Sequence, residues 1–448
     1  MLRSQTEMRF RLQISLIAVL ATAAQVYAKP QLMWVDQFGG ERYSFANDIA
    51  ADELGQVYVT GRVSGSVFGP AAGLSDVFIK KYSESGGVIW ATQFGSPAGD
   101  EGQDLALDGE GNLLLSAAFD NPGWPSPGDV VLRKYDPAAN VLWSRRFGTA
   151  AHDISEGLEP DGFGNFYVAG RTTGALDGPN GGTGSVLGSN DDMFLRKYDG
   201  AGILIWGRQW GGLGSEFPGG VAVDATGSAI VAGRVTIVEE GVPAGIAVAL
   251  RKFSPAGETI WERHVGSDVL DLWGGVELDD AGNIFVEGRV STHRGGGSYD
   301  DYAALAKFDE AGSLLWNRRL GAPVKDSSVH DVAVTADGHA YIAGSTDDDL
   351  SGPNAGGVDA FVAKYSPSGT HLWTYQLGTT ERDSVSAIDV DDLGNIFLTG
   401  TTLGDLGRPI QAGIEVWVAQ LREIAIPEPA GTSTLLVVFA ATALFRRR

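Results

Sequence analysis

The residues with the clearest chemical potential are acidic ones that recur at a fixed spacing. Five residues after the glycine of a repeated Phe-Gly-type dipeptide, six of seven units carry an acid, and Ser44 takes that place in the first unit. Carboxylates gathered around one centre could hold Ca²⁺ or another hard cation. The alternative, which we favour, is that each carboxylate caps its own loop by accepting backbone N–H bonds. The candidate metal ligands are Asp100, Asp153, Glu216, Asp271, Asp326 and Asp383.

The sequence contains no recognisable set of catalytic residues. Cysteine is absent, which excludes disulfides and thiolate chemistry. The six histidines show no metal-ligand spacing, and neither a Gly-x-Ser-x-Gly elbow nor a phosphate loop occurs. Glycosidase chemistry needs two carboxylates, and nothing singles out a pair among 56 acidic residues. The sequence therefore predicts a non-enzymatic protein without an organic cofactor, with Ca²⁺ as the one cofactor to test.

Three columns of residues repeat along the chain and must position these acids. The first column is Trp-x-x-x-Φ-Gly, with neighbouring tryptophans 53 to 63 residues apart. The second is Asp-x-x-Gly-Asn followed by alternating apolar residues, and the third is Lys-Tyr or Lys-Phe. The tryptophans could be platforms for sugar, but residues repeated in every unit more often pack between units. They stand at Trp34, Trp90, Trp143, Trp206, Trp261, Trp316 and Trp373.

Each unit contains four runs of strand length joined by tight turns. A four-stranded antiparallel sheet of about 55 residues, repeated radially, is a propeller blade. The chain starts with a spare outer strand, Leu32–Phe38, and its last unit ends after a third strand, Val416–Leu421. Joining the two would close the ring and remove its open edges. We therefore predict an all-β, seven-bladed β-propeller over residues 31–423, closed by the N-terminal strand.

The formal net charge of −23 limits the partners. A surface this acidic repels nucleic acid and anionic lipid and favours cations or basic partners. The loops between the second and third strands vary most in length, from 62–75 to 172–191, and such loops on a rigid scaffold often carry recognition. Four of them open on an arginine, namely Arg62, Arg171, Arg234 and Arg289. We expect a monomer.

The two ends of the chain have the character of export signals. Residues 1–28 contain a basic pair, an apolar run and Val26-Tyr27-Ala28, which predicts a signal peptide cleaved by signal peptidase after Ala28. Residues 424–448 contain Pro427-Glu428-Pro429, an apolar stretch slightly short for a membrane span, and three terminal arginines. In this order they resemble the PEP-CTERM sorting signal of Gram-negative bacteria. That resemblance implies transient membrane association, processing by an exosortase, and a final place at the cell surface or in the extracellular matrix. The alternative is an ordinary membrane anchor.

The repeat itself resembles the seven-bladed β-propeller repeat of bacterial surface and secreted proteins. The residues that carry the resemblance are Lys-Tyr, Gly-x-x-Trp, Phe-Gly-Gly and Gly-Asn-x-Tyr-Val-x-Gly. This family implies a fold and no shared activity. We expect an exported propeller that binds a protein, glycan or matrix partner through its rim loops. Two alternatives stay open: an enzyme like the quinoprotein dehydrogenases, which hold pyrroloquinoline quinone and Ca²⁺, and a purely structural matrix protein.

Overall fold

The computed structural model describes residues 29–121, 128–180, 191–212, 214–239, 242–265, 274–295, 298–321, 327–411 and 413–424. All regular elements in these ranges are strands, and no helix among them is long and apolar enough to cross a membrane. The predicted processing residues Ala28, Pro427, Glu428 and Pro429 lie outside the described residues, as do Asp271 and Asp326. Lys29–Ile424 forms one compact unit.

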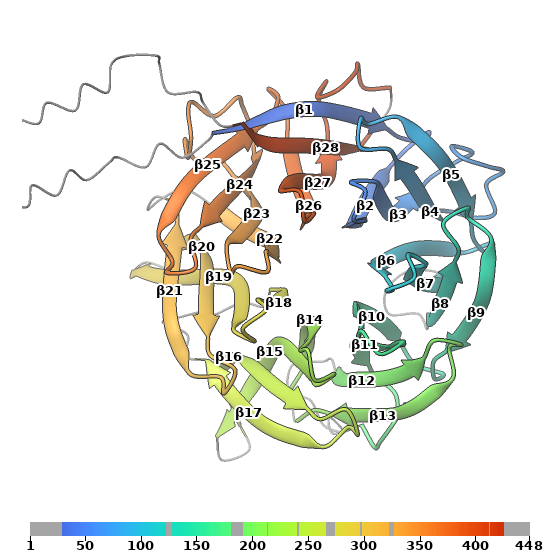
Figure 1. The fold of residues 1–448 in the computed structure, drawn as a ribbon, viewed down its shortest axis with the longest axis vertical. Coiled ribbons are helices and arrows are strands. Elements are labelled where there is room, and N and C mark those ends of the chain that lie inside the picture. Colours follow the sequence, from blue (N-terminus) through green and yellow to red (C-terminus); the bar gives the residue numbers. More distant parts are fainter. Residues whose placement is uncertain are drawn as a thin grey trace, which may run out of the picture. The chain divides into compact units, whose positions relative to one another are not determined.

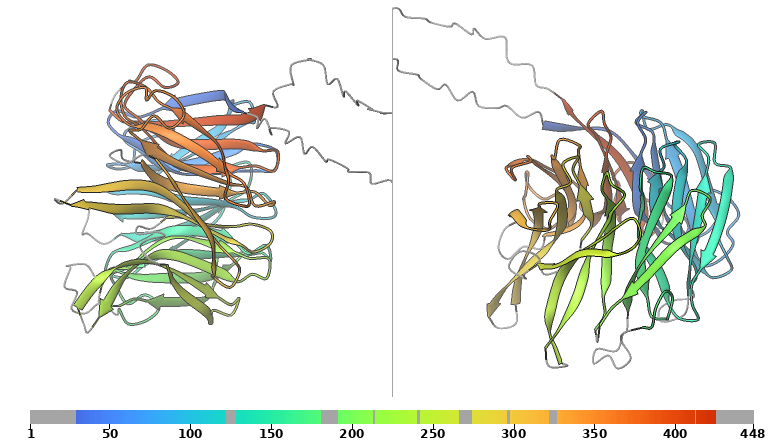
Figure 2. Two further views of the ribbon diagram at one scale, coloured as in Figure 1. Left: turned by 90° about the vertical axis from the view of Figure 1, so that its left-hand side faces the viewer. Right: turned by 60° about the horizontal axis from the view of Figure 1, so that its bottom comes forward.

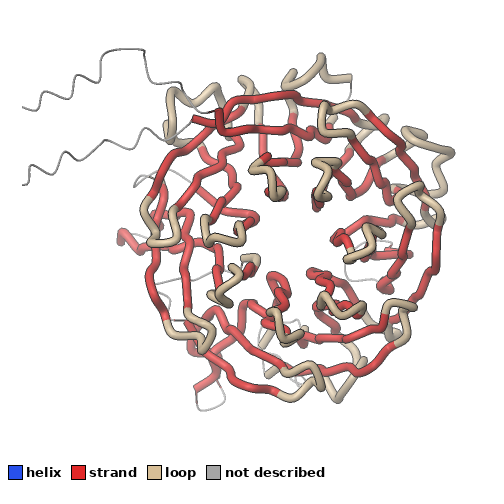
Figure 3. Tube along the Cα trace, viewed as in Figure 1, coloured by secondary structure: helices blue, strands red, loops and turns tan. Residues whose placement is uncertain are grey.

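Seven four-stranded antiparallel sheets stand around a common centre (Figure 1). The first three blades are β2 (Ser44–Ala51), β3 (Val57–Val63), β4 (Asp76–Tyr82) and β5 (Val88–Phe94); β6 (Gly99–Leu107), β7 (Leu113–Asn121), β8 (Asp129–Tyr135) and β9 (Val141–Phe147); and β10 (Asp153–Pro160), β11 (Asn165–Thr172), β12 (Asp192–Asp199) and β13 (Leu204–Trp210). Within each of these blades the chain runs from the innermost strand outward (Figure 1). Figure 3 shows the strands arranged around the ring and joined by loops.

The next three blades follow the same order. They are β14 (Phe217–Val223), β15 (Ala229–Glu239), β16 (Val242–Phe253) and β17 (Thr259–Val265); β18 (Val276–Leu278), β19 (Ile284–Gly295), β20 (Ser298–Phe308) and β21 (Leu314–Leu320); and β22 (Ser327–Val334), β23 (Ala340–Thr346), β24 (Asp359–Tyr365) and β25 (His371–Leu377). The hairpins β15–β16 and β19–β20 extend well beyond those of the other blades (Figure 2).

The seventh blade joins the two ends of the ring. It consists of β26 (Asp383–Val390), β27 (Asn395–Thr402), β28 (Glu415–Ile424) and, as its outer strand, β1 (Lys29–Phe38). The predicted closure is confirmed, and it is longer than expected because the pairing runs from Phe38↔Val416 to Lys29↔Ile424. Pairing the first strand with the last removes an exposed edge from the ring.

The hydrophobic core lies between the faces of adjacent blades. Val77 and Ile79 of the first blade pack with Leu113 and Leu115 of the second, and all four are almost fully buried. The strands read as apolar runs because both faces of each blade are covered. The ring is therefore held by seven such junctions in series.

Antiparallel pairing gives the ring two chemically different faces. One rim of the ring holds the connections between second and third strands and the connections between successive blades, and we call this rim the loop face. The turn face holds the tight Asp-x-x-Gly-Asn turns and the turns between third and fourth strands. Lys29 and Ile424 pair at the turn face.

Candidate functional site

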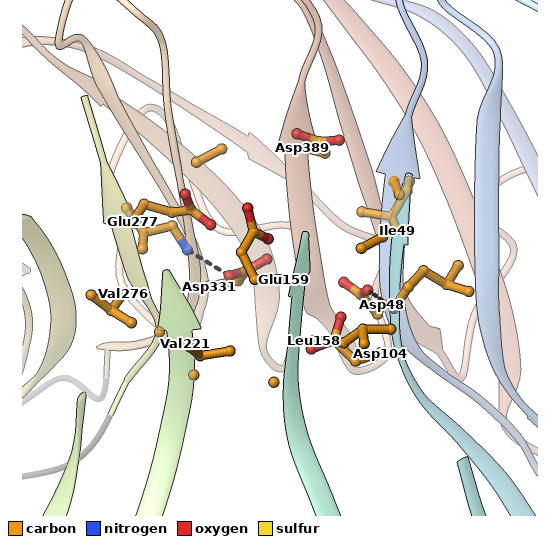
Figure 4. Close-up of a pocket in the computed structure, with 18 of the residues that line it drawn as sticks. Asp48, Ile49, Asp104, Leu158, Glu159, Val221, Val276, Glu277, Asp331 and Asp389 are labelled. Atoms are coloured by element: carbon orange, nitrogen blue, oxygen red, sulfur yellow. Dashed lines mark hydrogen bonds between the residues drawn. The ribbon is translucent and has the colours of Figure 1, made fainter. Parts of the chain in front are cut away.

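A cavity of about 340 Å³ occupies the centre of the ring and is lined by the inner strands of the blades. Six carboxyl groups project into it, each from a different blade (Figure 4). The residues that line this central cavity include no lysine, arginine or histidine. The six acids are Asp48, Asp104, Glu159, Glu277, Asp331 and Asp389; a seventh lining acid, Glu156, pairs with Arg171.

A β-bulge in the inner strands determines where these acids stand. The register with the second strand shifts by one residue, for example between Ala46 and Asp48 in β2. Asp48, Asp104 and Asp331 come directly after the bulge, and they form one layer. Glu159 and Asp389 stand two residues further on and form a second layer, to which Glu277 of the short strand β18 belongs by its pairing with Phe285. A bulge re-aims the side chain that follows it, which here turns a carboxyl toward the cavity.

No blade has an acid in both layers. Where a blade has an acid in one layer, its residue in the other layer is small, as with Asp48 and Ala50 or Gly157 and Glu159. The fourth blade has no acid in either layer and carries Gly220 and Ala222 instead. The acids are thus distributed around the cavity at two heights rather than gathered at one point.

Several of these carboxyls also connect neighbouring blades. Asp48 accepts a hydrogen bond from the backbone N–H of Leu105 in the next blade (2.6 Å). Asp331 accepts from Ile388 (2.8 Å), and Asp389 accepts from Ala51 across the closure of the ring (2.7 Å). Each bond satisfies a backbone donor that would otherwise face the cavity unpaired. The acids therefore have a structural role in addition to any part in binding.

Enclosure by protein raises the pKa of all six carboxyls. Burial is the first cause, and the neighbouring acids add to it: the pKa of Asp104 rises to about 7 and that of Glu159 to about 8. Asp331 has a pKa of about 8 and Asp389 of about 6 for the same reasons. The pKa values of Asp48 and Glu277 are raised well above the usual range. The central cavity can therefore hold protons near neutral pH and exchange them for another cation.

Of the acids singled out in the sequence, the four that the structure describes lie outside the central cavity and cap loops. Asp153 Oδ2 accepts from the backbone N–H and the hydroxyl of Thr149 (2.5 and 3.0 Å), and Asp383 Oδ2 accepts from the same groups of Thr379 (2.5 and 2.8 Å). Asp100 accepts from Ser96 in this way, and Glu216 accepts from the backbone of Gly212. In the described part of the chain, no three His, Cys, Asp or Glu side chains come together to hold a metal ion.

A steric requirement explains the glycine of the Phe-Gly dipeptide, which stands between the outer strand of one blade and the capped loop. A Cβ on Gly95 would lie 2.5 Å from Asp76 Oδ1 and 2.6 Å from Asp100 Oδ2. Gly148 stands in the same relation to Asp129 and Asp153. Only glycine lets two carboxylates approach the backbone this closely. The recurrence of glycine five residues before an acid thus reflects a loop geometry repeated from blade to blade.

The tryptophan column packs between blades. The Trp90 indole N–H donates to the carbonyl of Pro137, and that of Trp206 donates to Pro255, each in the following blade (3.3 and 2.9 Å). Trp143 and Trp316 make the same bond to Gly200 and Pro367. These rings and N–H groups are used within the scaffold, which is the structural role that repetition favoured.

The lysine column neutralises the turn aspartates. Lys134 lies 2.6 Å from Asp108, and Lys307 lies 3.0 Å from Asp279, in each case within one blade. In the sixth blade the aspartate is replaced by Thr335, and Lys364 pairs with Glu423 of the seventh blade instead (2.6 Å). The lysines thus have partners within the ring.

The rim loops of six blades fall into two classes on the loop face, and the second blade has Arg146 at the position that distinguishes them. In four blades an outer-strand glutamine clamps the loop between the second and third strands. Gln209, for example, accepts from the backbone of Leu176 and Asp177 (2.8 and 3.1 Å) and donates to Gly174 O and Asp192 Oδ2 (both 2.9 Å). The clamping residues are Gln37, Gln93, Gln209 and Gln376. In the fourth and fifth blades the clamping glutamine is replaced by His264 and Arg319. These two blades have the long hairpins β15–β16 and β19–β20.

The arginines at the starts of the loops have acidic partners. Arg62 pairs with Glu101 (3.0 Å), Arg171 with Glu156 (2.8 Å), and Arg289 with Asp301 (2.9 Å). Arg171 and Arg234 both lie against the ring of Phe217, at 4.8 and 4.5 Å from its centroid. These contacts fix the base of the loop face and leave the loop tips to vary.

Comparisons with known proteins support the fold. Residues 34–69 and 372–407 match the model of the family described as Beta-propeller repeat. An uncharacterized WD repeat-containing protein of Acanthamoeba polyphaga mimivirus is 19% identical over 390 residues, which are 74% of this chain and 26% of that protein. The regulatory protein FlaEY of Caulobacter vibrioides is 30% identical over 112 residues, or 23% of this chain and 12% of its own length. The chain thus spans about a quarter or less of these relatives.

Solved structures of low sequence identity were matched along most of this chain. The WD40 domain of Neurospora crassa Pan2 is 10% identical, with a TM-score of 0.49 over 87% of this chain and 95% of that one. The β-propeller domain of the Trilobed protease from Pyrococcus furiosus is 11% identical, with a TM-score of 0.49 over 87% and 98%.

Proposed function

We propose that this protein is an exported, non-enzymatic binding module that holds a protein, glycan or matrix partner on its loop face. The observation that carries the proposal is the division of that face into four clamped loops and two long hairpins above an otherwise repetitive ring. Variation confined to one rim of a rigid scaffold is typical of recognition surfaces. A loop held by four side-chain hydrogen bonds is also preorganised, which lowers the entropy that binding must offset.

The test is a binding screen of the full chain against glycans and exported proteins, followed by variants of the loop face. Each clamp is removed singly by Gln37→Ala, Gln93→Ala, Gln209→Ala or Gln376→Ala, and each long hairpin is shortened in turn. At least one change should weaken binding about tenfold while the thermal midpoint stays near that of the parent. Gln103→Ala, in an inner strand, is the matched control and should bind normally.

Two results would count against the proposal. Unchanged affinity in all six loop-face variants would place the partner elsewhere. A quinone absorbance band that develops on adding pyrroloquinoline quinone and Ca²⁺ would favour the enzyme instead. Export is tested separately by the intact mass of protein from its native host. We expect a chain that begins after Ala28 and ends near Pro429, whereas recovery of Arg446-Arg447-Arg448 would indicate a plain membrane anchor.

A further inference from the structure

One buried carboxylate stands out from its counterparts in the other blades. Glu287 on β19 is 1% exposed, and it occupies the position that is Thr60, Ala169 or Thr399 elsewhere. Its Oε1 accepts a hydrogen bond from the backbone N–H of Gly275 (2.6 Å), while its Oε2 has no hydrogen-bond partner. A buried carboxylate oxygen without a donor is costly, so its retention points to a ligand that supplies one.

Two glycines make room for this carboxylate and direct it toward the central acids. A Cβ on Gly274 would lie 2.2 Å from the Glu287 carboxyl carbon. A Cβ on Gly275 would lie 3.4 Å from Asp331 Oδ1 and 3.8 Å from Glu287 Oε1, so the carboxyls of Asp331 and Glu287 lie on the same side of Gly275. Glu287 also lines a second cavity of about 360 Å³, which shares Gly219 and Gly275 with the central one. Arg289, which pairs with Asp301, and His330 line this second cavity as well. We call this second cavity the side chamber.

The arrangement of the acids in the central cavity favours a chain of ammonium groups over a single metal ion. The carboxyls stand at two heights around the central cavity, and in the described residues no three of them meet at one point to ligate a metal ion. Separate carboxyl groups along a bore, which can exchange their protons for another cation, are instead complementary to a flexible chain with separate ammonium groups. Each ammonium has three N–H donors and no acceptor, which suits carboxylates that lack donors.

We propose that the central cavity and the side chamber together bind a linear polyamine. One terminal ammonium group is held by Glu287 and Asp331, and the remaining amino groups lie among the acids of the central cavity. The methylene segments contact the small apolar residues between the acids, such as Ala106 and Val221. The acids of this site stand on the inner and second strands, so it is distinct from a partner site formed by the loop tips.

The test is isothermal titration of the full chain in about 0.15 M salt, where long-range surface attraction is largely screened. The probes are spermidine, n-butylamine and Ca²⁺. Spermidine should bind at one site, and n-butylamine should bind at least about tenfold more weakly because it spans only one group of acids. Glu287→Gln preserves the shape of the side chain and removes its charge, so it should weaken spermidine binding about tenfold or more. Glu258→Gln, in an exposed turn, is the matched control and should change nothing.

A second variant covers the event that Glu287→Gln fails to fold. Glu159→Gln changes an acid of the central cavity in another blade and should also weaken spermidine binding several-fold. Unchanged affinity in Glu159→Gln would overturn the proposal, as would unchanged affinity in a folded Glu287→Gln. Equal affinity for spermidine and n-butylamine, or displacement of spermidine by equimolar Ca²⁺, would contradict a polyamine site.

Discussion

The glycine of the turn between third and fourth strands lies against the indole ring of the preceding blade. Gly257 has a φ of 80°, and a Cβ there would lie 2.8 Å from Trp206. Gly369 stands in the same relation to Trp316. The sequence predicted the turns and the interblade role of tryptophan, because both recur in a fixed column. It did not reveal that the turn and the tryptophan touch, since they belong to different units of the repeat.

This contact can be separated from backbone strain by comparing two glycines. Gly257→Ala adds a methyl group that meets Trp206, whereas Gly394→Ala has a similar φ of 77° and nothing within 4 Å. Both should lose about 1 kcal/mol from the left-handed backbone. We expect Gly257→Ala to be destabilised by a further 1–3 kcal/mol or so, because overpacking adds to strain. Equal unfolding free energies in urea would show that this interblade contact is unimportant.

The inner strands show where sequence reasoning reached its limit. The acids that cap the loops could be recognised in the sequence because each follows the glycine of the Phe-Gly-type dipeptide by five residues. The acids of the central cavity form no such column, since Asp48 and Glu159 stand two residues apart in the repeat. Five of the six share the bulge, which becomes apparent only when strands are aligned by their pairing. Inner strands that alternate small residues with single acids are the signal that could have identified them.

The inner strands also predict how stability depends on pH. Their carboxyls have pKa values of about 7 for Asp104 and about 8 for Glu159 and Asp331, above the usual value of an unfolded chain. The folded state therefore keeps protons that the unfolded state has already lost, so stability falls as pH rises. Histidines with lowered pKa values act in the opposite direction, but only below about pH 6.5.

We therefore expect the free energy of unfolding in urea to fall between about pH 6.5 and 8.5 and then to level off. The double variant Glu159→Gln/Asp331→Asn should show a shallower fall, because two of the proton-retaining groups are removed. Stability that rises over this interval would mean that the carboxyls of the central cavity are already ionised at neutral pH.

At the scale of the whole molecule, one strand pairing completes the ring. The repeat phase was legible in the sequence because a spare strand precedes the first unit and the last unit lacks one. The exact ends of that pairing could not be predicted from the sequence, because Lys29 and Ile424 belong to no repeated column. The central cavity and the loop face both depend on this closure, because it fixes the positions of all seven blades.

The most direct test of this account is a thiol titration of a full-length double variant, Gln31→Cys/Arg422→Cys. The chain has no natural cysteine, and these two residues lie directly opposite each other in β1 and β28. Opposed residues of antiparallel strands have Cα atoms close enough for a disulfide. We predict a monomer with no free thiol after oxidation, whereas Gln31→Cys/Glu258→Cys should keep both thiols. Free thiols or disulfide-linked dimers in the first variant would contradict the closed ring.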